Sequence, residues 1–410
     1  MTMTSVARLL LLMSIFWVGM DSYILVNVNY LDITIVTYLA QLIKILLFLA
    51  PAVIFYAKYG INKRALSVFF IYNLFLVVFV VFGLISGNDK TNIILSLKNI
   101  YLWIWYALLL NSINFKISTS FSRKIMFSFV VAILLNIVYS VYISLSFSGK
   151  LSDFYFYELY NNKGMFESWN FIRDGQVRAF GLVGSKLTLS QMAFIPGSFI
   201  MMAFIYNRDI LKKVFSLILG LVILYGLYIT NTRNPLFAIA LSTIVFLIFR
   251  RFKITGLRFL IVFIVVYLFS IYVVGYLSES GIGDESSQVR IPMIIDFLLQ
   301  LQNRPIGYGI GSTGIANLTY KFFYESSAAT IFMDLGVVGG ALFWLGVLRV
   351  AFVSMKYGND SQDVEMKILY QTISFSLLCL LFITNFTNIF DFSLMWFSII
   401  IVLATKIERT

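Results

Sequence analysis

Apolar runs of about 20 residues recur along the whole chain, and each is long enough to cross the ~30 Å hydrocarbon core of a membrane as a helix. Hydrophobic residues make up 60% of the 410 residues and charged residues only 12%, whereas roughly a quarter of a soluble domain is charged. The sequence therefore predicts an all-α, polytopic membrane protein with a single integral membrane domain over residues 1–410. A soluble protein of two or three domains is excluded.

The apolar runs predict about 12 transmembrane helices. The first run has Arg8 near its start, as a signal peptide would, but it is long and lacks a small-residue cleavage site, so it is predicted to be an uncleaved helix. The predicted spans lie near residues 6–26, 33–56, 65–86, 92–113, 123–147, 186–206, 212–230, 234–250, 257–278, 328–354, 367–386 and 388–405.

Basic residues concentrate in every second loop, which is the pattern that the positive-inside rule predicts for cytoplasmic loops. The short loops on the other side hold little beyond Lys90 and Arg233. Both termini are therefore predicted to be cytoplasmic, and the net charge of +12 reflects topology rather than nucleic-acid binding. The predicted inner loops carry Lys58, Lys63, Arg64, Lys116, Arg123, Lys124, Arg208, Lys212, Lys213, Arg250, Arg251, Lys253 and Arg258.

Two long loops, 149–185 and 279–327, both fall on the predicted outer face. Loops longer than about 15 residues are usually functional or disordered. Aromatic residues are frequent in both, which disfavours disorder and favours short amphipathic helices at the outer membrane interface. These aromatic residues include Tyr155, Tyr157, Tyr160, Trp169, Tyr308, Tyr320 and Tyr324.

The chain has no histidine and one cysteine, Cys379, which lies inside a predicted span. A disulfide framework, a histidine general base and a Ser-His-Asp triad are therefore excluded. The usual histidine zinc ligands are missing, and no cluster of carboxylates suggests a metal site. We expect neither a metal nor another cofactor.

The second long loop contains a predicted helix that starts near Arg290 and ends at Arg304-Pro305, because proline cannot continue a helix. Three glycines follow, Gly307, Gly309 and Gly311. Their amides could form an anion-binding nest, or the stretch could be a flexible turn that re-enters the membrane.

Three arginines are predicted on the outer face: Arg178, Arg233 and Arg290. Guanidinium groups match the oxygens of a diphosphate with paired hydrogen bonds and could stabilise it as a leaving group without a metal ion. Each arginine has a plainer interpretation. Arg178 could contact lipid phosphates, and Arg290 could cap its helix or pair with Asp296. A lone arginine at Arg233 opposes the positive-inside bias and favours a functional role.

Glu325 stands where the second long loop meets the next span, either as an interfacial anchor or as the base that takes a proton from a sugar hydroxyl. Asp334, one or two turns deeper, is the alternative base, and Arg304 and Tyr324 complete the predicted substrate-binding set. Lys44 and Asp391 are further charged residues inside predicted spans, where charges tend to face a cavity or a partner.

The order of these motifs resembles the O-antigen polymerase and O-antigen ligase superfamily. The similar segments are Arg178-Ala179-Phe180-Gly181, the turn Thr230-Asn231-Thr232-Arg233, the stretch from Arg290 to Gly311, and Asp334-Leu335-Gly336-Val337-Val338-Gly339. Asn234 stands where the family tends to have glycine, and Glu325-Ser326 stands where the ligase branch has histidine. The missing histidine favours a polymerase over a ligase.

The resemblance implies a GT-C-like membrane glycosyltransferase in the bacterial inner membrane, active at the periplasmic face. Such a polymerase transfers a glycan from undecaprenyl diphosphate onto a lipid-linked repeat unit. Its implied partners are undecaprenyl-diphosphate-linked oligosaccharides, membrane lipids and a chain-length regulator protein. In this interpretation Arg233 and Arg290 hold the diphosphate, Arg178 assists, and Glu325 is the base.

A flippase for the same lipid-linked units is the main alternative, because it can also have about twelve spans. Transporters often have two related halves and polar residues near the middle of the bilayer. Here the halves look unrelated and the polar residues concentrate in two outer loops. A structural scaffold is a third alternative, which would not explain arginines placed against the topology rule.

Overall fold

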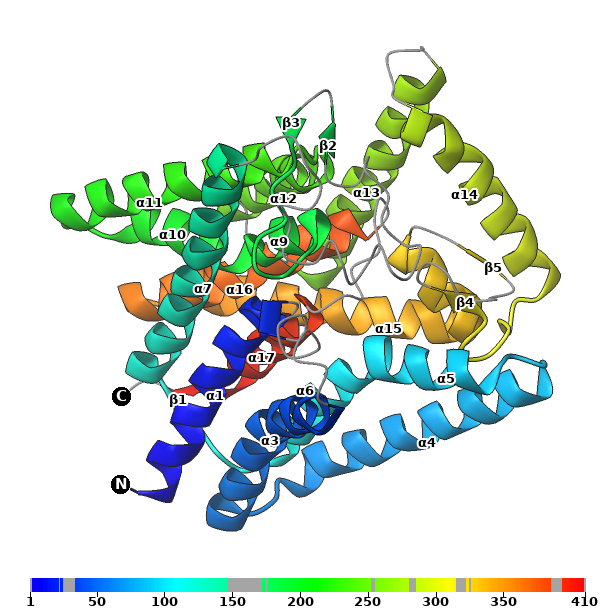
Figure 1. Cartoon of the computed structure of the whole chain (residues 1–410), viewed down its shortest axis with the longest axis horizontal. Coiled ribbons are helices and arrows are strands. Elements are labelled where there is room, and N and C mark those ends of the chain that lie inside the picture. The colour runs from blue at the N-terminus through cyan, green and yellow to red at the C-terminus, as the bar shows by residue number, and fades with distance from the viewer. Residues whose placement is uncertain are drawn as a thin grey trace.

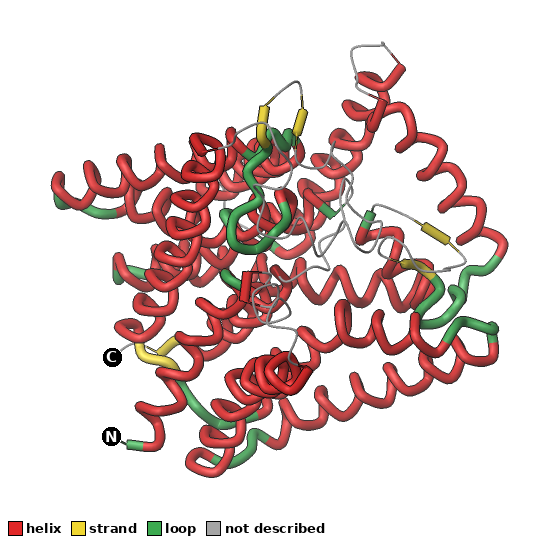
Figure 2. Tube along the Cα trace, in the orientation of Figure 1, coloured by secondary structure: helices red, strands yellow, loops and turns green. Residues whose placement is uncertain are grey.

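Helices make up nearly all of the regular structure in the computed structural model of the protein (Figures 1 and 2). It describes residues 2–21, 23–24, 34–146, 172–173, 176–251, 255–279, 285–314, 322–323, 326–384 and 393–408. The helices are α1 (Met3–Gly19), α3 (Thr34–Tyr59), α4 (Lys63–Ile85), α5 (Lys90–Ser96), the π-helix η1 (Leu97–Tyr101), α6 (Leu102–Ser112), α7 (Thr119–Ser146), α9 (Lys186–Met192), α10 (Phe194–Tyr206), α11 (Ile210–Ile229), α12 (Asn234–Arg251), α13 (Gly256–Glu279), α14 (Glu285–Asn303), α15 (Ser327–Asp360), α16 (Val364–Ile383) and α17 (Ser393–Lys406).

Three pairs of two-residue strands accompany the helices in the described part of the chain (Figure 2). The parallel pairs are β1 (Ile117–Ser118) with β6 (Ile407–Glu408) and β4 (Thr313–Gly314) with β5 (Phe322–Phe323), and the antiparallel pair is β2 (Ile172–Arg173) with β3 (Gln176–Val177).

Nine helical segments within the described residues are long and apolar enough to cross a membrane. Two shorter apolar helices, Met3–Gly19 and Asn234–Arg250, fall on two further predicted spans. The helices follow the predicted spans in order along the chain, and α14 corresponds to the helix predicted in the second long loop. The prediction of an all-α, polytopic membrane protein is confirmed.

Helix α16 lies at the centre of the bundle, where it packs against α10, α12 and α15 (Figure 1). Every residue from Ile368 to Ile383 is buried. In contrast, Gly83 is the only buried residue of α4. An apolar helix that exposes most of its surface has lipid as its natural neighbour, so α4 fits the edge of a membrane-embedded bundle.

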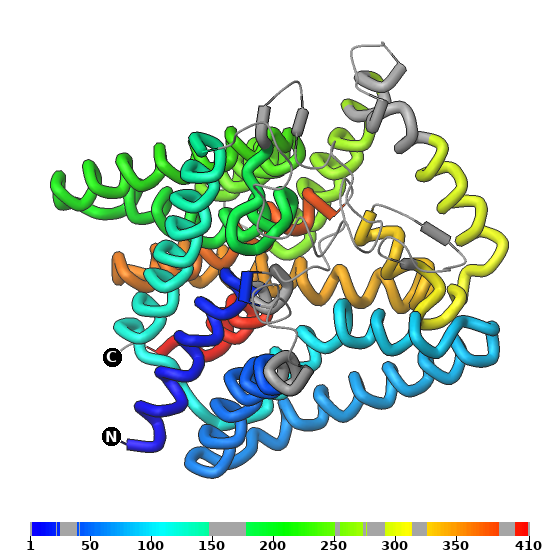
Figure 3. Tube along the Cα trace, in the orientation of Figure 1, coloured from blue at the N-terminus to red at the C-terminus, as the bar shows by residue number. Residues whose placement is uncertain are grey.

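The loops that the charge pattern predicts on one face do contact one another. Lys116 pairs with Glu408 (2.7 Å) and Arg123 with Glu365 (2.7 Å). The start of α1 and the end of α17 both lie toward the left of the tube (Figure 3). At the other end of the bundle, the Ala328 amide donates to the Thr384 carbonyl (3.4 Å). The helices therefore connect two separate sets of loops, as alternating spans require.

Helix α15 differs from the single uninterrupted span predicted over 328–354. It runs from Ser327 to Asp360, and at Gly336 its backbone leaves the helical conformation (φ 70°, ψ −178°). The helix is thus divided into a short first segment and a long second one. This break is filled by the glycine-rich loop that follows α14.

Candidate functional site

The loop of residues 305–313 inserts into the break of α15, and we term this loop and the break together the glycine interlock. Broken membrane helices are tolerated where neighbouring protein satisfies the freed backbone groups. Here the loop makes the bonds that a continuous helix would have made internally. The Tyr308 amide donates to the Met333 carbonyl (2.7 Å), the Gly309 amide to the Asp334 carbonyl (3.1 Å), and the Val337 amide to the Pro305 carbonyl (2.8 Å).

The three glycines of this loop permit direct contact between backbones. Gly307, Gly309 and Gly311 have φ angles of 87°, 79° and 86°, a region that residues with a side chain rarely adopt. A Cβ on Gly309 would overlap the backbone of Gly83 in α4, and one on Gly311 would lie 2.8 Å from the amide nitrogen of Ile93 in α5. Glycine is therefore required for the loop to pack on these helices.

The carboxyl group of Asp334 is buried inside the interlock. Its Oδ1 accepts hydrogen bonds from the amide (3.2 Å) and the hydroxyl (2.8 Å) of Ser312. Its Oδ2 accepts one from the hydroxyl of Tyr101 in η1 (3.2 Å). A buried carboxyl group needs such partners, since burying an unpaired one is costly. Asp334 therefore joins the loop, α15 and η1, and its oxygens are already engaged.

Asn88, in the turn between α4 and α5, holds the loop from the other side. Its side-chain amide donates to the carbonyls of Tyr308 (3.0 Å), Gly309 (3.2 Å) and Ile310 (3.1 Å). These hydrogen bonds matter because a buried carbonyl left unsatisfied costs roughly 1–3 kcal/mol. Asn88 and Tyr101 therefore both hold the interlock together. Neither residue was singled out from the sequence.

The interlock leaves no open nest of amides for an anion. Five amides of the stretch donate to groups of the protein itself, and glycine is needed there for packing. The geometry corresponds more closely to the predicted turn that re-enters the membrane than to the predicted nest. The five bonds run from Gly307 to Arg304 O (2.9 Å), Tyr308 to Met333 O (2.7 Å), Gly309 to Asp334 O (3.1 Å), Ile310 to Phe79 O (3.1 Å) and Ser312 to Asp334 Oδ1 (3.2 Å).

Arg304 links the end of α14 to α4. Its Nη2 donates to the hydroxyl of Ser86 (2.8 Å). Its guanidinium carbon lies 5.0 Å from the ring centroid of Phe82 and 4.9 Å from that of Tyr308, which is within the range of cation–π attraction. Fourteen residues of helix separate Arg304 from Arg290, a distance of about 20 Å. Arg290 lies in the second turn of α14, so most of that helix separates the two arginines.

Arg178 lies at the end of α11, next to the turn that carries Arg233. Its Nη2 donates to the Asn231 carbonyl (2.9 Å) and its Nε to the Thr230 carbonyl (3.4 Å). The Ala179 amide donates to the Ile229 carbonyl (2.9 Å). The last carbonyls of a helix lack internal partners and carry partial negative charge, so a buried guanidinium stabilises this helix end.

The turn 230–233 has a defined shape that directs Arg233 outward. Asn231 adopts a positive φ of 49°, which asparagine tolerates better than most residues. The hydroxyls of Thr230 and Thr232 are hydrogen-bonded to each other at 2.6 Å. The Arg233 side chain is exposed and makes no hydrogen bond or ion pair with any described residue. It is therefore available to an external anion.

Gly181 packs the Arg178 segment closely against α7. Its φ is 61°, and a Cβ would overlap the side-chain oxygen of Asn136 in α7. Asn136 accepts a bond from the Val183 amide (3.2 Å) and donates to the Gly19 carbonyl (2.8 Å). The arginine–glycine motif thus has two structural contacts, one at α11 and one at α7.

The side chains of three predicted site residues lie outside the described part of the structure. Arg290 is helical within α14, but its side chain lies outside what the structure describes, as do Tyr324 and Glu325 altogether. Glu325 directly precedes Ser326, the N-cap of α15, whose hydroxyl donates to the Thr384 carbonyl (3.0 Å). The chain beside Glu325 is thereby fixed against the end of α16.

Lys44, predicted to need a partner inside the membrane, pairs with Asp21 at 2.7 Å. Asp21 is fully buried and also accepts a bond from the indole of Trp17 (2.9 Å). The other charged residue predicted inside a span, Asp391, lies outside the described residues. Asp21 falls within the first predicted span, 6–26, and was not singled out from the sequence as a partner for Lys44.

Among the described residues, no group of three or more histidine, cysteine or acidic side chains could hold a metal ion. Comparison of the chain with models of protein families finds no matching family, and comparison with curated proteins finds no matching relative.

Proposed function

We propose that the protein is a polysaccharide polymerase of the O-antigen polymerase type. It transfers a glycan from undecaprenyl diphosphate onto a lipid-linked repeat unit. The observation that carries the proposal is the meeting of the Arg178 segment with the turn of Arg233, two elements far apart in the sequence. Both belong to motifs that resemble this superfamily. The all-α, polytopic fold supports the same conclusion.

In the proposed topology the chain crosses the bacterial inner membrane twelve times, with both termini in the cytoplasm. The end of the bundle that carries Arg178, Arg233 and Ser326 faces the periplasm. The basic residues in the loops at the opposite end support this orientation under the positive-inside rule. The substrates reach the site from the outer leaflet, and a chain-length regulator protein is a partner in the membrane.

In the proposed reaction an acceptor sugar hydroxyl attacks the anomeric carbon that is bonded to diphosphate. The new glycosidic C–O bond forms as the C–O bond to diphosphate breaks, and the leaving group keeps the electron pair. Arg233 and Arg290 stabilise the charge on the departing diphosphate, since guanidinium groups bind its oxygens in pairs. Glu325 receives the proton of the attacking hydroxyl.

The structure supports a different task for Arg178. Its guanidinium bonds the carbonyls of Thr230 and Asn231, so it assists by holding the turn that presents Arg233. The interlock likewise supports an indirect role for Arg304, the three glycines and Asp334. These residues position α14 and α15, which lead to Arg290 and Glu325.

The decisive experiment incubates purified protein with lipid-linked repeat units in the absence of divalent metal and separates the products by chain length. The wild-type protein should yield a ladder of polymers. Arg233→Ala and Arg290→Ala should each reduce the rate about 100-fold or more, as loss of a charge-stabilising donor does in other transfer enzymes. Arg208→Ala is the matched control, because Arg208 is exposed in a loop at the opposite end of the bundle.

The outcomes separate the alternatives. A ligase would form no polymer from repeat units alone, and absence of any product with competent substrate would refute the polymerase. In cells, loss of a polymerase leaves single lipid-linked units at the outer face, whereas loss of a flippase leaves them at the inner face. An unaltered distribution of glycan length in Arg290→Ala would remove that residue from the site.

A further inference from the structure

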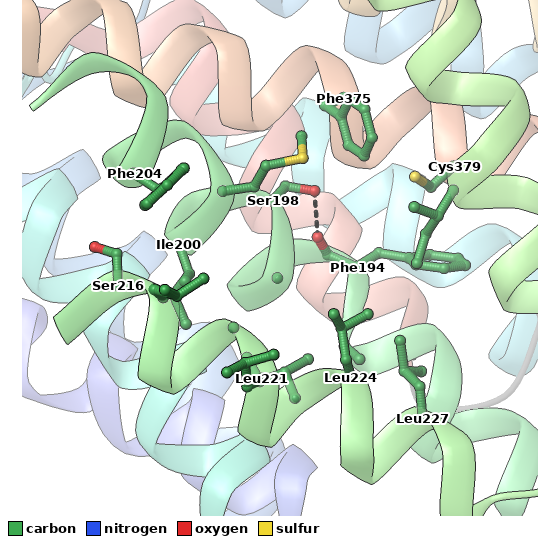
Figure 4. A pocket seen from close by; sticks show the side chains of 17 residues that line it. Phe194, Ser198, Ile200, Phe204, Ser216, Leu221, Leu224, Leu227, Phe375 and Cys379 are labelled. Carbon is green, nitrogen blue, oxygen red and sulfur yellow. Dashed lines mark hydrogen bonds between the residues drawn. The ribbon is translucent and has the colours of Figure 1, made fainter. Parts of the chain in front are cut away.

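Helices α10 and α11 line an apolar cavity of about 230 Å³, with α12 and α16 behind it. Figure 4 shows Leu221, Leu224 and Leu227 along one side and Phe375 and Cys379 on the opposite side. This volume is below the roughly 300–1,000 Å³ of pockets that enclose a whole small ligand. The cavity therefore suits one stretch of an apolar chain rather than a complete molecule.

The cavity is open on the side where a membrane protein meets lipid. Its rim residues Leu217, Leu221 and Leu224 are 50%, 58% and 51% exposed, whereas Phe375 at its floor is 2% exposed. The hydroxyl of Ser198 in the lining donates to the Phe194 carbonyl, so it stays satisfied when an apolar chain fills the space. The cavity is thus a groove that a lipid chain can enter sideways.

Glycines on the two facing helices keep this groove open. A Cβ on Gly197 would lie 3.8 Å from Ile223, and one on Gly220 would lie 3.7 Å from Ile200, which are ordinary contacts. By contrast, a Cβ on Gly226 of the same helix would meet Ile137 of α7 at 2.5 Å. Helix packing explains the glycine at 226. It does not explain those at 197 and 220, which line the groove, so that only a side chain longer than that of alanine would fill it.

The groove leads toward the end of α11 that carries the free arginine. From Ser216 to Leu227 the lining follows α11 for about 16 Å. The Thr230 amide, which begins the turn, donates to the Leu227 carbonyl at the end of the groove (3.3 Å). Exposed Arg233 lies three residues further along the chain, at the end of that turn. An apolar channel with a cation at one end matches a lipid with one chain and an anionic head.

We infer that this groove binds the isoprenoid tail of the lipid carrier, with the first units beside Leu227 and the diphosphate at Arg233. The inference rests on the proposed function, which supplies a carrier of this chemistry. A groove of this volume takes a single chain, whereas a bilayer phospholipid has two chains on one head. The groove would hold the carrier at a fixed depth, so that its diphosphate lies beside Arg233.

The test places photoreactive benzoylphenylalanine at position 221 in the groove rim, or at position 218 on the same helix outside the groove. Each protein is reconstituted in phosphatidylglycerol nanodiscs with radiolabelled undecaprenyl diphosphate and irradiated. Ile218 is a matched control because it is 54% exposed, close to the 58% of Leu221. We expect at least tenfold more label at 221, displaced by unlabelled carrier. Equal labelling at the two positions would overturn the inference.

A second measurement fills the groove. Gly220→Leu should raise the KM for the lipid-linked donor tenfold or more with a smaller change in kcat, whereas Gly220→Ala, whose Cβ fits, should behave as wild type. Polymerisation by Gly220→Leu with an unchanged KM would overturn the groove while leaving the proposed function intact. Specific labelling at 221 by a wild-type protein that makes no polymer would support the groove and overturn the polymerase.

Discussion

Replacing Gly309 by alanine tests whether the glycine interlock stabilises the fold. The substitution has two separate costs. Its φ of 79° would place alanine in the left-handed region, at about 1–2 kcal/mol. Its Cβ would also overlap the backbone of Gly83 and lie 2.8 Å from the carbonyl carbon of Phe82. Overpacking of this kind costs roughly 1–3 kcal/mol, so we expect a total loss of about 2–5 kcal/mol.

Two other glycines separate these costs. Gly60 has a φ of 69° but nothing within 4 Å of a built Cβ, so Gly60→Ala carries the backbone strain alone. Gly346 in α15 has neither a positive φ nor a close neighbour. Gly346→Ala should therefore stabilise the helix by about 0.5–1 kcal/mol. The difference between Gly309→Ala and Gly60→Ala measures the contact of the loop with α4.

The assay is thermal unfolding of the three purified variants in detergent, followed by tryptophan fluorescence. Gly309→Ala should melt lowest, Gly60→Ala between it and wild type, and Gly346→Ala at or above wild type. A difference of a few degrees between the first two corresponds to the expected cost of the overlap. A Gly309→Ala protein that melts no lower than Gly60→Ala would show that the loop is not packed on α4.

Two further substitutions probe the buried polar groups. Asp334→Ala would leave the Ser312 amide and the Tyr101 hydroxyl without an acceptor, at roughly 1–3 kcal/mol each. Asp334→Asn keeps an acceptor oxygen and should melt closer to wild type. Equal melting temperatures of the two variants would contradict the role of Asp334 as a hydrogen-bond acceptor in the interlock. Lys44→Met should destabilise the protein by about 3 kcal/mol or more, because it removes the ion-pair partner of buried Asp21. The double variant Asp21→Asn/Lys44→Met should recover part of that loss, and a further drop in its melting temperature would refute the pairing.

The helical architecture could be predicted because hydrocarbon thickness imposes a length on every span. Runs of apolar residues set where helices lie, and the described helices follow the predicted order. The charge pattern was similarly informative, because loops predicted on one face do meet, as in the pairs Lys116–Glu408 and Arg123–Glu365. Both signals depend on local composition, which a single sequence contains.

The role of the glycine loop could not be predicted in the same way. Glycine indicates freedom of the backbone, but the group that approaches it comes from elsewhere in the chain. Gly309 meets α4, and Gly307 meets Gly336 across the break of α15. Gly336 itself lies within an apolar run, where one glycine costs a helix only about 1 kcal/mol and so gives little sign of a break. The partners Asn88 and Tyr101 are more than 200 residues away from the loop that they hold.

The partners of the predicted arginines divide them into two kinds. Arg178 and Arg304 are bonded to the protein, through the carbonyl of Asn231 and the hydroxyl of Ser86. Arg233 is exposed and unbonded among the described residues. From the sequence, the positive-inside bias favoured a functional role for Arg233, while Arg178 and Arg290 each had a plainer interpretation as well. Geometry separates Arg178 and Arg304, which shape the site, from Arg233, which is free to bind an anion.

The interlock also affects the position of Arg290. Arg304 and the glycine loop fasten one end of α14 to α4 and α15, and Arg290 lies about 20 Å away along the same helix. Met293 and Phe297 of α14 also pack against Ala329 and Met333 of α15, so a shift of the loop and α15 is passed along α14 toward Arg290. Catalysis of group transfer depends on placing such charges within a fraction of an ångström. Gly309→Ala should therefore reduce polymer formation even at temperatures where the protein stays folded, although the loop itself contacts no substrate.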